Sequence, residues 1–293
     1  MNCLLCGSDQ SSIFARVESF GFPLVYLHCD QCGLIYQSEE DNKAADPDFY
    51  TSNYRKIYQA TEEPTGKDLW VQQQRAAHLV KILNATLPQA PSRILDVGAS
   101  TGVLLKTFQD AFGCAVTGVE PGDAYRSYAE GQGIPMFPSL EALTASKADK
   151  FSLVSLIHVL EHLPDPVGTV ASIRRDLLDK DGYLLLEVPN FYAHDSYELA
   201  HLACYTPHTL QEVLRKAGFE PVVVNRHGVP RSAMLNLYIT VIACPSSDDT
   251  PVPQARPESL VALRRQAGLY YRRLVQRLFP HQAWLPLAQG KDD

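Results

Sequence analysis

Two carboxylates frame a glycine-rich turn in the middle of the chain. The apolar run Arg93–Val97 contains Asp96 and leads into Gly98-Ala-Ser-Thr-Gly102, and a second apolar run ends at Glu120. A strand, a turn, a helix and a second strand of this total length form one βαβ unit. The glycines let the backbone approach a ligand, and a carboxylate at position 120 can accept hydrogen bonds from both hydroxyls of a ribose. The segment therefore predicts a nucleoside-binding half-sheet.

The charge around this turn favours a positively charged nucleoside over a dinucleotide. The G-x-G-x-x-G pattern of pyrophosphate-binding turns is absent, and Asp96 stands just before the turn. S-adenosylmethionine carries a sulfonium and an ammonium group. The segment resembles the first motif of the class I S-adenosylmethionine-dependent methyltransferases, Leu-Asp-x-Gly-x-Gly-x-Gly, with Ser100 in place of the middle glycine. An ordinary βα turn in another α/β protein is the alternative.

The resemblance extends over about residues 68 to 245 and implies a set of cofactor contacts. Ser139 occupies the position where the adenine ring normally lies, although the acidic residue usual at that place is not evident. The implied S-adenosylmethionine-binding residues are Asp96, Gly98, Ala99, Ser100, Gly102, Glu120, Pro121, Ser139, Ile157 and His158.

A histidine-rich motif follows the next apolar run, Phe151–Ile157. It reads His158-Val-Leu-Glu161-His162-Leu-Pro-Asp-Pro166 and resembles the post-strand motif of methyltransferases that act on small molecules. An imidazole near neutral pKa is a natural general base for a hydroxyl or an acidic C–H. We expect His162 to be the base and Glu161 to orient it, although each histidine could instead be structural. The candidate catalytic residues are His162, Glu161, His201 and His158.

The same motif matches H-x-x-E-H, the pattern of inverted zinc peptidases. That chemistry requires a helix that carries both histidines on one face. Here the preceding residues have the pattern of a buried strand, and Pro164 and Pro166 interrupt any helix that follows. The sequence favours the methyltransferase interpretation.

Four cysteines near the N-terminus have the spacing of a metal site. Cys3 and Cys6 form one C-x-x-C-G knuckle, and Cys29 and Cys32 form another. Four thiolates in this pattern suit a tetrahedral structural Zn2+ in a small ribbon of alternating strands. Two disulfides or a redox pair are the alternatives, but no apolar signal segment precedes Cys3, so we expect a reducing, cytoplasmic compartment.

Charge helps to choose between two groups of methyltransferases that carry such a ribbon. One group methylates guanine in ribosomal RNA, and the other acts on sugars and related natural products. The net charge is −7, and the ribbon itself is acidic, so a footprint for a phosphate backbone is missing. We expect O- or C-methylation of a small-molecule acceptor and regard nucleic acid as an unlikely partner. A non-catalytic cofactor-binding or protein-interaction module is the alternative from another class.

The expected fold is α/β, with a Rossmann-like seven-stranded methyltransferase sheet, an N-terminal zinc ribbon and a C-terminal amphipathic helix. The expected parts are a ribbon over 1–45, a linker and helix over 46–92, a core over 93–245, and a linker and helix over 246–293. Tyr50 and Tyr54 are candidates to approach the cofactor from the first linker. No stretch has the apolar length of a membrane span.

The C-terminal helix has apolar residues at helical spacing and arginines elsewhere. The pattern predicts packing on its own domain or on a second copy of the chain, and contact with an anionic membrane surface or an acidic carrier is the alternative. The apolar positions are Leu260, Leu263, Ala267, Tyr270, Leu274 and Leu278.

Overall fold

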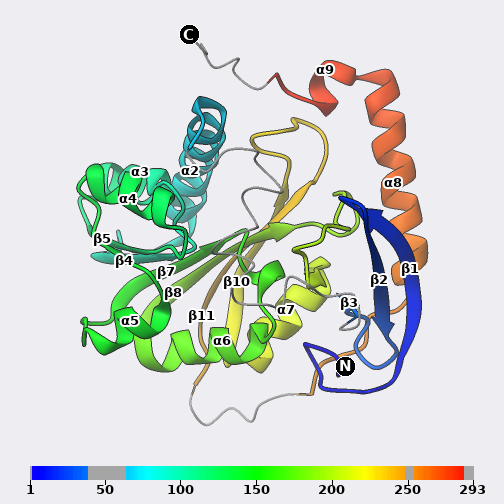
Figure 1. Ribbon diagram of the computed structural model, residues 1–293, viewed down its shortest axis with the longest axis horizontal. Coiled ribbons are helices and arrows are strands. Elements are labelled where there is room, and N and C mark those ends of the chain that lie inside the picture. Colours follow the sequence, from blue (N-terminus) through cyan, green and yellow to red (C-terminus); the bar gives the residue numbers. More distant parts are fainter. Residues whose placement is uncertain (1, 39–63, 248–253, 287–293) are drawn as a thin grey trace.

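The computed structural model describes residues 2–38, 64–247 and 254–286, so Tyr50 and Tyr54 lie outside the described residues. Its core is a seven-stranded sheet in the order β10-β11-β8-β7-β4-β5-β6 (Figure 1). The neighbouring strands are parallel except for β11, which is antiparallel to β8 and β10. The predicted α/β class and seven-stranded sheet are confirmed. The strands are β4 (Arg93–Val97), β5 (Ala115–Val119), β6 (Met136–Phe137), β7 (Phe151–Ile157), β8 (Leu178–Pro189), β10 (Phe219–His227) and β11 (Tyr238–Pro245).

The central strand β4 pairs in parallel with β5 on one side and with β7 on the other. The strand order therefore reverses at β4, and the loops that leave β4 and β7 separate toward opposite faces of the sheet. In open α/β sheets, ligands bind in the crevice beyond the carboxyl ends of the strands at such a reversal. This topology brings the turn after Asp96 and the motif after Ile157 to the same edge.

Helices cover both faces of the sheet (Figure 1). One face packs against α2 (Gly66–Thr86) and α3 (Val103–Phe112), and α4 (Asp123–Gly131) lies beside them. The other packs against α5 (Leu140–Ala145), α6 (Pro166–Ser172), its π-helical continuation η5 (Ile173–Leu177), and α7 (Pro207–Lys216).

Local sequence sets where these helices begin. Thr65 caps α2 in a reciprocal pair of hydrogen bonds with Asp68, and Thr206 caps α7, which has Pro207 at its first position.

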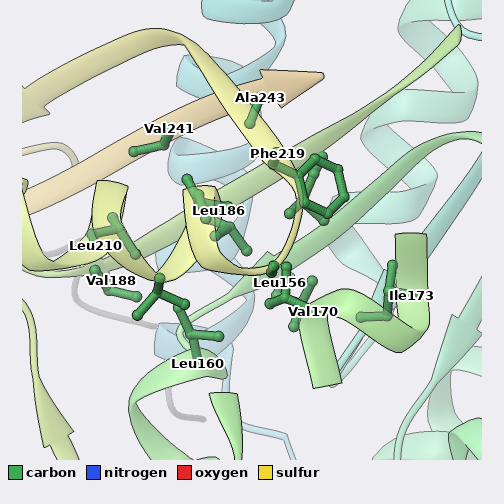
Figure 2. Close-up of a cluster of buried hydrophobic side chains, with 14 of the residues drawn as sticks. Leu156, Leu160, Val170, Ile173, Leu186, Val188, Leu210, Phe219, Val241 and Ala243 are labelled. Carbon is green, nitrogen blue, oxygen red and sulfur yellow. The ribbon is translucent and has the colours of Figure 1, made fainter. Parts of the chain in front are cut away.

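Alternating residues of each strand supply the two apolar cores, as strand geometry requires. In β4, Ile94 packs toward α2 and α3, whereas its neighbour Leu95 packs toward α5, α6 and α7. Figure 2 shows the second core, where Leu156 and Leu186 from the sheet meet Val170 of α6.

The N-terminal module is a small antiparallel sheet. Its strands are β1 (Ser11–Ser19), β2 (Phe22–Cys29) and β3 (Ile35–Gln37). A fourth strand, β9 (Ala203–Cys204), comes from the core part of the chain and pairs with β3. The module is thus joined to the core through its own sheet, and Tyr26 and Ile35 are buried against Phe191 and Leu199.

The predicted C-terminal helix is present as α8 (Val261–Leu278), followed by α9 (Pro280–Ala283), and α8 stands beside the N-terminal module (Figure 1). The face that packs is not the predicted apolar stripe but the one that carries Val261, Arg265 and Val275. Arg265 is buried and donates hydrogen bonds to the carbonyls of Phe191 and His194, the latter at 2.6 Å. Arg272 reaches Asp195 at 2.6 Å. Guanidinium groups can satisfy these carbonyl and carboxylate oxygens, whereas leucine cannot.

The apolar stripe of α8 faces outward. Leu263, Tyr270 and Leu274 are 60%, 70% and 43% exposed. The expected contact of this stripe with a second copy or a membrane surface stays a prediction. Among the described residues, no helix combines the length and the apolar character required to cross a bilayer.

We predict that Gly268→Ala destabilises the protein. Alanine within a helix is normally favoured over glycine by about 1 kcal/mol, but a Cβ at position 268 would lie 1.9 Å from the carbonyl oxygen of Tyr192. Displacing α8 should cost about 1–3 kcal/mol. Chemical denaturation measures the change, with the exposed Gln266→Ala as control. A more stable Gly268→Ala would contradict the observed packing.

Candidate functional site

The turn after β4 has a left-handed backbone at three positions. Gly98, Ser100 and Gly102 have φ values of 76°, 51° and 73°. A Cβ on Gly98 would lie 2.4 Å from a methyl carbon of Val159, and one on Gly102 would lie 2.5 Å from Ile134. The glycines are therefore required by the backbone conformation and by close side-chain packing. The close approach to a ligand that the sequence also predicts for these glycines stays a prediction.

Ser100 departs from the methyltransferase motif, and the structure shows what holds it. Its hydroxyl accepts a hydrogen bond of 3.2 Å from the side-chain amide of Gln72 on α2, and the Thr101 hydroxyl donates to the same amide at 2.6 Å. Gln72 thus fixes α2 on the turn. Sequence reasoning missed Gln72 because nothing in the pattern of α2 marks it.

The two predicted carboxylates are both buried: Asp96 lies in β4, and Glu120 directly follows the neighbouring strand β5. Glu120 accepts backbone hydrogen bonds from Ser100 and Gly122, each at 2.9 Å. Asp96 accepts a hydrogen bond of 2.6 Å from the hydroxyl of Ser155 on β7. Burial raises the pKa of Asp96 to about 7, so a cationic ligand beside it would stabilise its charged form.

The other predicted cofactor residues lie at or just after the carboxyl ends of the parallel strands β4, β5, β6 and β7. Ala99 is buried in the turn, Pro121 is exposed after β5, and Ile157 is half-buried at the end of β7. Ser139 follows β6 and caps α5, because its hydroxyl accepts a hydrogen bond from the Ala142 amide at 3.2 Å. Its expected contact with adenine stays a prediction.

The four predicted catalytic residues come together where β7 ends. His158 has a φ of 58°, and Glu161 and His162 follow in the short 3-10 helix η4 (Leu160–His162). His201 arrives from the segment before β9, and its ring centroid lies 5.1 Å from that of His162. We call Glu161, His162 and His201 the Glu–His cluster. One ligand atom from each lies within 4.8 Å of the others, close enough to share a cation as well.

The charge state of this cluster is set by burial and by its neighbours. Burial lowers the pKa of His162 to about 4 and also lowers that of His201. Burial alone would raise the pKa of Glu161, but the hydrogen bond from His158 and the nearby histidines hold it at about 2. At neutral pH the cluster therefore combines an ionised carboxylate with uncharged imidazoles.

His158 connects the cluster to a second buried carboxylate. Its Nδ1 lies 3.3 Å from Glu161 Oε1, and its Nε2 lies 3.2 Å from Glu187 Oε1 on β8. Burial and Arg75 favour a lower pKa for His158, but these two carboxylates outweigh them and raise it. His158 thus lies between two buried carboxylates and contacts both of them.

Sequence reasoning missed the residues around Glu187. Arg75 of α2 lies 2.7 Å from Glu187 Oε1. On the other oxygen, Thr240 donates at 2.9 Å and His227 lies 3.2 Å away. These partners come from separate elements, so no local spacing identifies them. The signal that could have been used was an acidic residue inside the buried strand β8.

The geometry contradicts the inverted-peptidase interpretation. His158 follows the last residue of β7, and η4 is a single turn of 3-10 helix that begins two residues later. The two histidines of the motif therefore do not share a helical face, as that chemistry requires. His158 instead contacts the two buried carboxylates Glu161 and Glu187.

The four cysteines of the N-terminal knuckles form one compact cluster. Their sulfur atoms lie within 4.8 Å of one another, with Cys3 and Cys32 3.5 Å apart and Cys6 and Cys29 3.4 Å apart. No disulfide joins them in this structure, and all four sulfurs face one common point instead of forming two separate pairs. Tetrahedral Zn2+ with bonds of about 2.3 Å places its sulfurs about 3.8 Å apart, so the donor set and spacing fit the predicted structural zinc.

Comparison with known proteins agrees with the topology and the turn. A family described as "Methyltransferase domain" matches residues 71–224, more than half of the chain. The chain belongs to this methyltransferase family. The expected membership of the class I S-adenosylmethionine-dependent methyltransferases, and with it the expected fold, is thereby confirmed.

Curated relatives align with only part of this methyltransferase. A ubiquinone biosynthesis O-methyltransferase of Actinobacillus pleuropneumoniae is 33% identical over 109 residues, which cover 33% of this chain and 46% of that protein. One from Cereibacter sphaeroides is 27% identical over 177 residues, which cover 52% of this chain and 70% of that protein. The chain spans about half the length of the first of these relatives.

Among solved structures, a Burkholderia thailandensis 1,6-didemethyltoxoflavin-N1-methyltransferase superposes with a TM-score of 0.53. The superposition covers 80% of this methyltransferase and 100% of the Burkholderia chain, and the two sequences are 21% identical. At this level of identity the similarity describes the fold.

We predict that the protein binds about one zinc ion per chain and that Cys32→Ser abolishes this binding. A small ribbon depends on its metal for folding free energy, so the variant should also lose protease resistance in its first forty residues. Elemental analysis and limited proteolysis measure the two effects. Cys244→Ser, which replaces a free thiol on β11, is the control. Full zinc content in Cys32→Ser would rule out this site.

Proposed function

We propose that this methyltransferase transfers the methyl group of S-adenosylmethionine to a hydroxyl of a small molecule, a sugar or another natural-product intermediate. The observation that carries the proposal is the Glu–His cluster, in which a neutral His162 lies beside an ionised Glu161 at the edge of the sheet reversal. The names of the relatives support O-methylation as the reaction type. The acidic ribbon favours a small acceptor over RNA.

The cofactor would lie over the turn between β4 and α3. When bound, it supplies an electrophilic methyl group on a sulfonium. Asp96 offers a carboxylate whose ionisation a positive ligand favours. Glu120 accepts hydrogen bonds from the backbone amides of Ser100 and Gly122, and carboxylate oxygens can also accept them from ribose hydroxyls. These residues bind and orient the donor.

The tautomer of His162 suits proton removal from an acceptor hydroxyl. Its Nδ1 lies 2.8 Å from the carbonyl oxygen of Ala200, so Nδ1 must carry the proton of the neutral ring. The other nitrogen, Nε2, is then the basic one. It can accept the hydroxyl proton as the oxygen attacks the methyl group, and the carboxylate of Glu161 stabilises the resulting imidazolium.

Glu120→Gln should weaken cofactor binding at least tenfold. The amide replaces a charged acceptor that holds two backbone N–H groups, and each charge-assisted bond contributes about 1.5–3 kcal/mol. Calorimetric titration with S-adenosylmethionine and S-adenosylhomocysteine measures the effect. Glu130→Gln, an exposed change on α4, is the control. Equal affinities for wild type and Glu120→Gln would exclude Glu120 from the cofactor site.

His162→Gln should lower kcat by about 10²–10⁴-fold and leave the affinity for S-adenosylmethionine unchanged. Transfer of radioactive methyl groups to dihydroxybenzoates and to nucleotide sugars provides the assay. His281→Gln, at an exposed position on α9, is the control. Undiminished turnover in His162→Gln would remove this residue from the mechanism, and cofactor binding without turnover on any acceptor would favour a non-catalytic module.

The pH dependence of the wild-type rate gives an independent check. The pKa of His162 is lowered to about 4 from an ordinary 6.5, so the ring stays unprotonated as the pH falls through 6.5. The part of kcat/KM that depends on this base should therefore persist until the pH approaches 4. A loss of rate centred near 6.5 would assign the base to a different group.

A further inference from the structure

A short segment of the core carries His201 and lies between the N-terminal ribbon and the Glu–His cluster. We call residues 198–202 the His201 segment. On one side, the amide of Gln37 in β3 donates to the carbonyl of Leu202 at 2.9 Å. The side-chain amide of Gln37 donates to the carbonyl of Leu199 at 3.4 Å. Directly after Leu202, β9 pairs with β3, so the ribbon fixes the backbone here.

The opposite side of the same segment contacts the predicted catalytic residues. The amide of Leu202 donates to the carbonyl of Glu161 at 2.8 Å. The carbonyl of Ala200 accepts the hydrogen bond from Nδ1 of His162 at 2.8 Å. The tautomer of His162 and the place of His201 therefore both depend on how this segment is held.

One ribbon side chain reaches the turn of the segment itself. Tyr26 of β2 is fully buried, and its hydroxyl lies 2.8 Å from the carbonyl oxygen of Glu198 and 3.2 Å from that of His201. The amide of His201 also donates to the carbonyl of Glu198 at 3.0 Å. A buried phenol requires a partner for its proton, and here the acceptors are the two ends of the turn that presents His201.

We propose that Tyr26 is a positioning residue of the methyl-transfer site. It acts through the His201 segment, because its hydroxyl holds the turn from Glu198 to His201 and thereby the carbonyl that orients His162. The ribbon then has a role in the reaction in addition to its structural zinc. This inference rests on the proposed function of the Glu–His cluster.

Tyr26→Phe removes the hydroxyl and keeps the aromatic packing. Zinc content and the affinity for S-adenosylhomocysteine should stay at wild-type values. Tyr36→Phe is the matched control, because Tyr36 is equally buried in the same sheet, and none of the hydrogen bonds found for the described residues joins its hydroxyl to the His201 segment. The measurement is an NMR spectrum of full-length, zinc-loaded protein labelled with ¹⁵N-histidine. The imidazole nitrogen resonances of His162 and His201 should shift in Tyr26→Phe and should not shift in Tyr36→Phe.

The second readout is turnover of the best acceptor among dihydroxybenzoates and nucleotide sugars. Tyr26→Phe should lower kcat by roughly ten- to a hundredfold, the scale of a small misplacement of catalytic groups, with KM for S-adenosylmethionine within about twofold of wild type. If Tyr26 acts by orienting His162, the double variant Tyr26→Phe/His162→Gln should be no slower than His162→Gln alone. Fully additive losses would overturn the proposal.

The two readouts separate this inference from the proposed function. In one outcome, the imidazole resonances shift in Tyr26→Phe while His162→Gln and His201→Gln both keep wild-type turnover. Tyr26 would then order histidines that do not catalyse, and both the positioning role and the proposed base would be overturned. Unshifted resonances would overturn the positioning role even if His162→Gln is inactive.

Discussion

The site depends on one imidazole shared by two buried carboxylates. Glu161 and Glu187 are almost completely excluded from solvent, and a buried charge is costly unless a counter-charge and hydrogen bonds accompany it. His158 lies between them, and Arg75 supplies a second cation to Glu187. The left-handed backbone at His158 turns the chain out of the sheet so that one ring reaches both carboxylates. Strand β8, helix α2 and the Glu–His cluster are joined at this point.

The parts of the structure that local sequence determines were predictable. The apolar run, the glycine turn and the second run define β4, α3 and β5 because each depends on neighbouring residues only. The cysteine knuckles were predictable for the same reason, since each pair of sulfurs is brought together by a single turn. His158, Glu161 and His162 belong to one motif, and a strand end places them together.

The parts that depend on distant elements were not predictable. Gln72 and Arg75 lie on one helix with no pattern that distinguishes them from other polar residues. The packing face of α8 was expected to be apolar, but the loop it covers offers carbonyl oxygens, and Arg265 satisfies them where leucine could not. The need for glycine at positions 98 and 102 was predictable, whereas the close packing of Val159 and Ile134 against them was not.

The shared sheet of ribbon and core has a consequence for the order of synthesis. Strands β1 to β3 and all four cysteines leave the ribosome early, but β9, which completes their sheet, comes only at residues 203–204. Val261, which packs with Tyr26 and Ile35 in the apolar core between the ribbon and the rest of the chain, is made later still. Chains begin to fold during translation. In the nascent ribbon, β3 therefore pairs with β2 only, and its other edge stays unpaired until β9 has been made. Early metal capture would hold that edge in register until its partner strand arrives.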